Sequence, residues 1–341
     1  MKIAIHHRVG SFSDRWIEYC QKNDIDHKLV NAFDNDIIQQ VRDCDAFMWH
    51  HHHGQFKDVL TAKRILFALE QAGVKVFPDF NTGWHFDDKV AQKYLLEAID
   101  APLVPSYIFY DKNKALAWAK DTTYPKVFKL KGGASAKNVK LVRTYKEAKK
   151  LIYQAFDKGF AQFDKISNFK DNFNSFKYDN GSLLGVAKST ARLIIEPKYS
   201  RQQNHEKGYI YFQDFVPNNS FDVRVIVTGN KAYAAKRYVR GNDFRASGSG
   251  IKDYNKESIN IECIKTAFLV KEKLNVQTIS YDFVFDTENK PLIIEISYGF
   301  PTNWADDSPG YWDSSLQWHE GSFNPQSWMV TDLIESLKRF G

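Results

Sequence analysis

Two carboxylates stand in apolar segments where a strand core would carry hydrophobic side chains. Residues 279–285 and 291–296 are rich in β-branched and aromatic residues, and the DTENK segment between them carries turn-forming residues, so together they predict an antiparallel hairpin. Asp282 lies in the first segment and Glu295 in the second. Because close carboxylates repel and are costly to bury unpaired, we expect a positive charge between them. Mg²⁺ that bridges nucleotide phosphates fits this pattern. Acids on the solvent face, or paired with Lys or Arg, are the structural alternative.

Lysines and a glycine loop lie upstream, in the order that a nucleotide site requires. Lys89 falls in the first turn of a predicted helix, where a cation opposes the helix dipole, so it is poorly placed for an ordinary surface lysine. Lys129 falls within an apolar strand, and a half-buried lysine needs an anionic partner. Small residues follow at once, and their backbone amides can approach a phosphate. The candidates in this loop are Gly132, Gly133 and Ser135. A hairpin with an exposed lysine explains Lys129 equally well.

A third concentration of charge lies in residues 221–240, which predict a hairpin turned at the GN pair at 229–230. Asp222, Arg224 and Arg237 are set in strands that otherwise have the composition of a core. A second glycine loop follows, and its candidate residues are Arg245, Ser247 and Gly248. Converging cations suit neutralisation of a triphosphate and stabilisation of the charge that develops during phosphoryl transfer. Surface salt bridges are the alternative for some of these residues.

The sequence of residues 1–84 predicts a separate domain, which contains further candidates for the functional site. Strands and helices alternate along residues 1–84, so we expect a parallel, doubly wound sheet, and ligands on such sheets bind beyond the carboxyl ends of the strands. Four polar residues that follow two of these strands are candidates for a wall that faces the substrate: His6, His7, Arg8 and His50. Consecutive residues of an extended chain point to opposite faces, so the histidine run at 50–53 suits metal chelation poorly. An ordinary polar loop is the equal alternative.

The rest of the chain divides by composition. We expect residues 85–122 to connect the first domain to a central unit at 123–208, and residues 209–341 to form a C-terminal unit that contains the metal site. Residues from about 160 to 207 are rich in Asn, Phe and Lys. Long loops inside a domain are usually lids, so we interpret this stretch as a flap over the site. Alternating aromatics and lysines would also suit single-stranded nucleic acid.

Composition limits the class of protein. The chain has 341 residues, 43% of them hydrophobic, a net charge of +6 and three cysteines. It predicts a folded protein of two or three domains, and the modest, dispersed charge suits small anionic ligands at least as well as nucleic acid. No stretch resembles a signal peptide or reaches the length of about 20 apolar residues that spans a membrane, so we expect a cytoplasmic protein without membrane attachment. A homodimer is compatible with these features but not required by them.

Seven short segments carry a resemblance to a known family. In chain order they are DDK at 87–89, PKVFK at 125–129, QDFV at 213–216, DVR at 222–224, FRASG at 244–248, YDF at 281–283 and EIS at 295–297. This order resembles the ATP-grasp superfamily, and within it the carboxylate–amine ligases of the ribosomal-protein glutamate ligase, glutathione synthetase and D-alanine ligase kind. The resemblance spans residues from about 85 to 300. It implies an α/β (α+β) fold with an N-terminal doubly wound parallel sheet, a central lid and a C-terminal antiparallel sheet.

The resemblance also implies a role for each candidate. Lys89 and Lys129 would bind the α and β phosphates of ATP, and Asp222 would bind the ribose. Asp282 and Glu295 would ligate Mg²⁺ or Mn²⁺. The backbone that would hold adenine belongs to Gln213, Asp214, Phe215 and Val216. The groups that would stabilise the acyl phosphate and the tetrahedral intermediate are Arg237 and Arg245. The third metal ligand is usually Asn in this family, and Ser297 stands there, although a hydroxyl is a poorer ligand than an amide oxygen.

The implied reaction is the ATP-dependent joining of a small carboxylate to an amine through an acyl phosphate. The segment that follows Glu295 is rich in Tyr, Trp and Asp, which suit sugars or amino acids, so it favours an amino acid and a sugar acid as the substrates. Packing of a domain interface is the alternative for these aromatic residues. No nucleophile from the protein is required, which agrees with the lack of a convincing nucleophile–base arrangement in the sequence. A phosphotransferase on the same fold is the rival enzyme. A module that binds single-stranded nucleic acid is the rival without enzymatic activity, and we consider it the weaker of the two.

Overall fold

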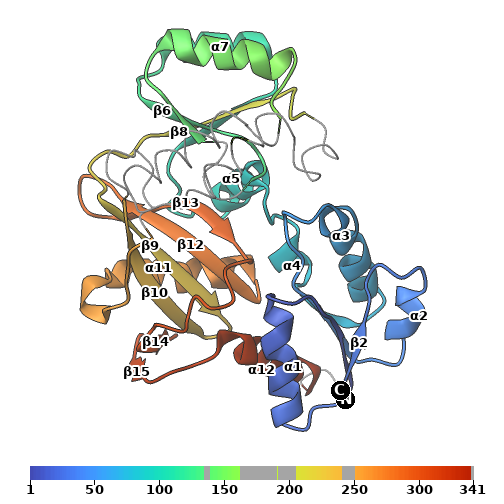
Figure 1. Cartoon of the computed structure of the whole chain (residues 1–341). Coiled ribbons are helices and arrows are strands. Elements are labelled where there is room, and N and C mark those ends of the chain that lie inside the picture. The colour runs from blue at the N-terminus through green and yellow to red at the C-terminus, as the bar shows by residue number, and fades with distance from the viewer. Residues whose placement is uncertain (134–138, 162–189, 191–204, 240–249, 339–341) are drawn as a thin grey trace.

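Three β-sheets organise the part of the chain that the structure describes, which comprises residues 1–133, 139–161, 190, 205–239 and 250–338 of a computed structural model (Figure 1). We call them the N-terminal sheet, the lid sheet and the C-terminal sheet. In Figure 1 the lid sheet lies at the top, the C-terminal sheet at the left and the N-terminal sheet at the right, with helix α5 (Lys89–Ala98) between them. None of the helices in these ranges is long and apolar enough to cross a membrane.

The N-terminal sheet is parallel, as predicted, with the strand order β2-β1-β3-β4. All four residues of β1 and of β3 are buried, which is the pattern of strands covered on both faces. The strands are β1 (Ile3–His6), β2 (His27–Val30), β3 (Ala46–Trp49) and β4 (Lys75–Phe77). The helices are α1 (Phe12–Lys22), α2 (Ile37–Val41), α3 (Phe56–Gln71) and α4 (Phe80–Gly83).

The C-terminal sheet is antiparallel and has the strand order β13-β12-β9-β10-β14-β15, with β11 paired to β10. The predicted hairpins at 221–240 and 279–296 form its β9–β10 and β12–β13 pairs, and β13 is an edge strand. Its strands are β9 (Phe221–Thr228), β10 (Lys231–Tyr238), β11 (Lys252–Asp253), β12 (Thr278–Phe285), β13 (Pro291–Ser297), β14 (Gly310–Asp313) and β15 (Trp318–Glu320). A short 3-10 helix, η1 (Lys256–Ser258), precedes helix α11 (Ile261–Leu274).

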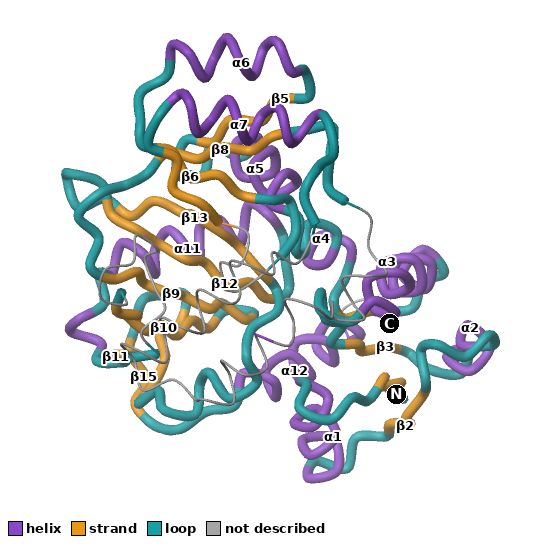
Figure 2. The backbone as a smooth tube through the Cα atoms, turned by 45° about the horizontal axis from the view of Figure 1, so that its top comes forward, coloured by secondary structure: helices purple, strands orange, loops and turns teal. Residues whose placement is uncertain are grey.

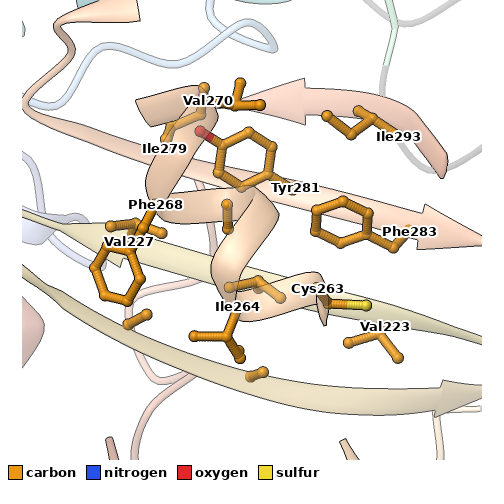
Figure 3. Packing of buried hydrophobic residues seen from close by; sticks show 14 of the residues in the cluster. Val223, Val227, Cys263, Ile264, Phe268, Val270, Ile279, Tyr281, Phe283 and Ile293 are labelled. Atoms are coloured by element: carbon orange, nitrogen blue, oxygen red, sulfur yellow. The ribbon is translucent and has the colours of Figure 1, made fainter. Parts of the chain in front are cut away.

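One face of the C-terminal sheet is apolar and is covered by α11. Alternate residues of β9 and β12, such as Val223, Val227, Tyr281 and Phe283, point to this face and pack against Phe268 and its neighbours on the helix (Figure 3). Because side chains alternate along a strand, the intervening residues must point to the opposite face. That opposite face carries the charged candidates.

The lid sheet has the strand order β5-β8-β6-β7 and is antiparallel. Helices α6 and α7 lie side by side over it (Figure 2). Small residues of both helices share one core cluster with Phe128 and Phe212. Its strands are β5 (Ser106–Phe109), β6 (Lys126–Lys129), β7 (Val139–Val142) and β8 (Ile210–Asp214), and its helices are α6 (Lys112–Asp121) and α7 (Tyr145–Phe156).

The predicted unit boundaries need correction at the lid. Strand β5 was expected in the connecting segment 85–122 and β8 in the C-terminal unit 209–341, but both pair within the lid sheet. The lid is therefore assembled from segments distant in sequence, which composition could not reveal. Helix α12 (Pro325–Lys338) also packs against segments that are distant in sequence. Its Met329 and Val330 share one core cluster with Trp16 of α1 and Tyr233 of β10.

Candidate functional site

A row of charged side chains crosses the polar face of the C-terminal sheet. Glu295 on β13 lies opposite Asp282 on β12, and Asp282 lies opposite Arg224 on β9. Asp222 on β9 lies opposite Arg237 on β10. Residues opposite each other in antiparallel strands project from the same face, so these five side chains form one group, which we call the acid–arginine row.

Asp282 is the centre of the acid–arginine row. Arg224 donates from Nε to Oδ1 at 2.7 Å and from Nη2 to Oδ2 at 2.8 Å, and Nη2 of Arg237 lies 2.8 Å from Oδ2. Burial would raise the pKa of this carboxyl, but the charges of the two arginines outweigh that effect and hold the pKa well below its usual range. Asp282 is therefore a fixed anion. Its pairing with two arginines matches the structural alternative given for this acid, and its contact with Mg²⁺ stays a prediction.

Asp222 is paired with Arg237 and is only 1% exposed. Burial raises the pKa of Asp222 to about 6, against the opposing charge of Arg237. Both carboxylate oxygens accept hydrogen bonds from the guanidinium of Arg237. Asp222 therefore holds the guanidinium of Arg237, and its contact with a ribose stays a prediction.

Lys89 joins the row from helix α5. Its Nζ lies 3.2 Å from Oε1 of Glu295 and donates to the carbonyl oxygen of Gly133 at 2.8 Å. Burial lowers the pKa of Lys89, but Glu295 and Asp87 outweigh this and raise it overall. The helix begins at Lys89 because Asp88 is its N-cap and accepts a hydrogen bond from the amide of Ala91. Lys89 is thus held as a cation between the lid and the C-terminal sheet.

Lys129, at the end of β6, is a buried cation with no carboxylate partner within 4 Å in the described part of the chain. Its Nζ donates to Oε1 of Gln213 at 2.6 Å and to the carbonyl oxygen of Ile294 at 3.3 Å. Burial lowers its pKa to about 8, although Glu295 acts in the opposite direction. A buried ammonium with only neutral acceptors is unfavourable alone, so this position favours an anionic ligand.

The segment Gln213–Val216 connects β8 of the lid sheet to β9 of the C-terminal sheet. Gln213 is buried between Lys129 and Ser106, and Asp214 pairs with Lys126 at 2.5 Å. The side chains of Phe215 and Val216 are half-buried. The chain therefore passes from one sheet to the other next to Lys129, which is where a nucleotide base could lie. The contact with adenine stays a prediction.

The glycine loop makes an arrangement that the sequence did not reveal. Three consecutive amides donate to carboxylates: Lys131 N to Oε2 of Glu206 at 3.0 Å, Gly132 N to Oε1 of Glu206 at 3.2 Å, and Gly133 N to Oδ1 of Asp87 at 2.9 Å. Successive amides that converge on one anion are typical of phosphate sites. The role of Asp87 at the loop could have been suspected from the DDK segment, where Asp87 stands two residues before Lys89. Glu206 reaches the loop through a bridge with Phe160, which no local pattern indicates.

Two of the histidines predicted to face the substrate are structural. Nδ1 of His6 accepts from the amide of Ala32 at 3.0 Å, and Nδ1 of His50 accepts from the amide of Phe12 at 3.1 Å. His50 also stacks on the Phe12 ring with 3.6 Å between centroids. Burial lowers the pKa of both imidazoles. His6 is the last residue of β1 and His50 directly follows β3, so both imidazoles continue the packing of a buried strand, and their contact with a substrate stays a prediction.

His7 and Arg8 keep their predicted place in the loop after β1. His7 is exposed and its Nδ1 lies 3.0 Å from Oγ of Ser13. Arg8 is half-buried, and its Nε is buried without a hydrogen-bond partner among the described residues. An unsatisfied guanidinium nitrogen is uncommon and marks a place where a ligand could bind. Their substrate role stays a prediction.

Ser297 does not point out as a ligand would. Its Oγ donates to the carbonyl oxygen of Gly299 at 2.9 Å and accepts from the amide of Gly299 at 3.1 Å. The hydroxyl therefore closes a local turn at the end of β13, and this arrangement is against the predicted metal role. Four other candidates lie outside the described residues: Ser135, Arg245, Ser247 and Gly248. Most of the predicted flap at 160–207 also lies outside them.

The two acids were tested as a site for a hard cation. Asp282 and Glu295 are adjacent on one face, and such an ion commonly takes one or two carboxylates and completes its shell with phosphate oxygens and water. Within the described residues no group of three or more His, Cys, Asp or Glu could hold a metal alone. The pair therefore fits Mg²⁺ that arrives with a nucleotide, and the ion would share Asp282 with two arginines.

The chain is similar to several known proteins. No protein-family model matches it. The α-aminoadipate–LysW ligase LysX of Saccharolobus solfataricus is 23% identical over 238 residues, which is 68% of each chain. The solved structures that resemble it include the RimK domain ATP-grasp protein of Sphaerobacter thermophilus, with a TM-score of 0.56 and 14% identity over 98% of this chain and 99% of that one.

Two further solved structures have similar scores. D-cycloserine synthetase DcsG has a TM-score of 0.59 and 12% identity, and the match covers 99% of this chain and 100% of that chain. The D-alanine–D-alanine ligase of Bacillus anthracis has a TM-score of 0.55 and 13% identity, and the match covers both chains completely. These matches span all three sheets of the molecule.

Proposed function

We propose that this chain, which has the ATP-grasp fold, is an ATP-dependent ligase that joins a small carboxylate to an amine. The observation that carries the proposal is the convergence of Lys89 and Lys129 on the acids of the acid–arginine row, at the junction of the lid sheet and the C-terminal sheet. This convergence supplies both signs of charge that a magnesium triphosphate requires. The relatives that are named as ligases support the same proposal.

Each group of the site has a part in nucleotide binding. Lys129 has no anionic partner among the described residues, so a phosphate would neutralise it, and Lys89 would contact a neighbouring phosphate from the start of α5. The crossing segment Gln213–Val216 would hold the adenine. Asp282 and Glu295 would hold Mg²⁺, which when bound would offset the charge of the phosphates.

The reaction would proceed in two steps. An oxygen of the substrate carboxylate attacks the γ-phosphorus of ATP, the bond from that phosphorus to the bridging oxygen breaks, and ADP leaves. The amine then attacks the acyl carbon of the acyl phosphate, inorganic phosphate leaves and the amine loses a proton. Lys129 and Lys89 would hold the phosphates in line. Arg237, held by Asp222 and Asp282, would present a fixed positive charge to the reacting oxygens.

The narrower predictions belong to this proposal as well. The attachment of an amino acid to a sugar acid is one such assignment of the two substrates. Assembly as a homodimer and a cytoplasmic location are others, and the fold itself is neutral on both.

A trapping assay tests the proposal. The purified chain is incubated with Mg-ATP, a panel of carboxylates and hydroxylamine, which converts an acyl phosphate into a coloured hydroxamate. We expect hydroxamate and ADP in equal amounts with at least one carboxylate, and neither product without Mg²⁺. ADP release that instead requires a hydroxyl compound, with a phosphate ester as product, would identify the phosphotransferase and contradict the ligase.

A further inference from the structure

A pocket of about 650 Å³ lies beside the acid–arginine row, between the N-terminal sheet and the lid. The histidine loop after β3 and the start of α3 form one side. The segment that leads into α5 forms the floor, and the base of the lid at residues 131–132 and 205–209 forms the other side. We call this hollow the lateral pocket. Its volume is in the range of sites for small organic ligands.

A chain of polar contacts through the glycine loop links the lateral pocket to Lys89 and Glu295. Asp87 and Gly132 line the pocket, and Asp87 accepts a hydrogen bond from the amide of Gly133. The carbonyl oxygen of Gly133 accepts from Lys89, which in turn contacts Glu295 of the row. A ligand in the pocket could thus place one end next to the predicted phosphates.

Aromatic rings form much of the wall. The Phe86 ring packs edge to face with His51 at 5.2 Å between centroids, and with His53 at 5.8 Å. Tyr110 and Tyr209 add two further rings to the lining. Flat rings provide apolar surface for a ligand's C–H groups at little cost in conformational entropy, and the tyrosines add hydroxyl groups at their edges.

Acidic and basic side chains also line the lateral pocket. Asp58 is 3% exposed and accepts from the amide of His52 at 2.7 Å through Oδ2. Lys63 donates to the carbonyl oxygen of Trp84 at 2.6 Å and makes no ion pair with any described carboxylate. Burial lowers the pKa of Lys63, with Asp88 and Asp87 acting in the opposite direction. The pocket therefore offers an incompletely neutralised cation together with acceptors and aromatic surface.

We propose that the lateral pocket binds the carboxylate substrate and that this substrate is a polyhydroxylated acid of the sugar-acid class. The assignment rests on the proposed ligase function for the fate of the carboxylate, but not for binding. A sugar acid has C–H faces for the rings, hydroxyl groups for Asp58, Asp87 and the tyrosines, and an anionic group for Lys63. An aliphatic diacid would offer no hydroxyl groups to Asp58 and Asp87 and would bring a second negative charge close to them, which disfavours it.

Calorimetric titration of the full chain with three matched probes tests the assignment. D-glucuronate has both hydroxyls and a carboxylate, D-glucose lacks the carboxylate, and adipate has six carbons and carboxylates without hydroxyls. We expect glucuronate to bind at least about 10-fold more tightly than either of the others, since each missing set of groups leaves pocket groups unpaired. Equal binding of adipate and glucuronate would overturn the assignment.

Substitutions of two lining residues, with one control outside the lining, test whether glucuronate binds in the lateral pocket. Lys63→Gln should weaken glucuronate binding by about 10-fold, the effect of losing one charged contact. Arg64→Gln is the matched control, because Arg64 is the next residue of α3, is exposed and does not line the pocket. The affinity of this variant for glucuronate should stay within about 2-fold of the parent. Lys131→Gln, which removes an exposed side chain of the lining, guards against misfolding of the first variant and should weaken binding in the same direction. Unchanged affinity in both lining variants would refute the pocket.

The outcomes separate this inference from the proposed function. If another carboxylate yields hydroxamate while glucuronate fails to bind, the pocket assignment falls and the ligase stands. If glucuronate binds in a Lys63-dependent manner while no carboxylate yields hydroxamate, the pocket stands and the ligase falls.

Discussion

The acid–arginine row and the buried histidines near the N-terminal sheet are two clusters of titratable groups. Folding keeps the first cluster charged and the second cluster neutral. In the row, Asp282 keeps its charge because Arg224 and Arg237 contact it directly. Among the histidines, His51 and His85 are buried with few charged neighbours, and burial lowers their pKa values to about 3 and about 4. One region preserves charge and the other removes it.

The difference shows which region is organised around an ionic ligand. Burying ion pairs is costly unless geometry and function retain them, whereas neutral imidazoles among aromatic rings pack as ordinary core side chains. His50 on Phe12 and His51 beside Phe86 are packed in this way. Variants that change charge in the row should therefore affect turnover, and those in the histidine region should affect mainly acid stability.

The largest effect is expected from Asp282→Asn. The change should lower Mg-dependent ADP release by about 1,000-fold, the scale of losing a preorganised electrostatic group, and should lower the free energy of unfolding by about 3 kcal/mol because two arginines lose their shared partner. ADP assays and urea denaturation measure the two quantities. Glu288→Gln, on the exposed turn of the same hairpin, is the control and should change neither. Retention of normal ADP release by Asp282→Asn would remove the row from the active site.

Lys129→Met should weaken nucleotide binding by about 100-fold, since one buried charged contact to a phosphate is lost. The control is Lys140→Met on the neighbouring strand β7, where the side chain is exposed. Equilibrium titration with a fluorescent ATP analogue measures both. If the two variants bind the analogue equally, Lys129 has no role in phosphate binding.

The parent protein should also bind nucleotide less well at alkaline pH. Burial lowers the pKa of Lys129 from 10.5 to about 8, so the free protein loses this positive charge as the pH rises through 8. The same shift has the opposite sign for stability, because the cost of burying the charge disappears between pH 8 and 10.5. Affinity that stays constant from pH 7 to 9.5 would contradict the assignment.

A smaller effect, on stability alone, is expected from His85→Phe. The pKa of His85 is lowered from 6.5 to about 4, so its contribution to stability is complete above pH 6.5 and is lost as the pH falls toward 4. Between pH 7.5 and 5 the loss is about 2 kcal/mol for this group. The phenylalanine variant should therefore show a shallower loss of stability on acidification. Urea denaturation at both pH values measures it, and identical slopes in parent and variant would show that His85 is not neutralised by folding.

The same contrast explains what the sequence could and could not predict. The hairpin of Asp282 and Glu295, the parallel N-terminal sheet and the start of α5 at Lys89 follow from strand composition, alternation and an N-cap, all of which are local signals. The pairing of Asp222 with Arg237 depends on the register of two strands. The contacts of Glu206 and Asp87 with the glycine loop depend on segments distant in sequence. The burial of His6 and His50 depends on aromatic rings such as Trp49 and Phe12, and the polarity of the local sequence does not indicate this packing.

Ser297→Ala is expected to have the smallest effect and lies where the two regions meet. Ser297 ends β13 next to Glu295, and the next residue, Tyr298, donates to the carbonyl oxygen of His51 at 2.7 Å. Because its hydroxyl only closes a turn on Gly299, its loss should reduce ADP release by no more than about 3-fold and stability by about 1 kcal/mol. ADP assays over a range of Mg²⁺ concentrations distinguish the roles. Loss of a turn residue would lower activity equally at all Mg²⁺ concentrations, whereas loss of a metal ligand would raise the Mg²⁺ concentration needed for half-maximal activity. A rise of more than about 10-fold in that concentration would therefore show that the Ser297 hydroxyl is a metal ligand.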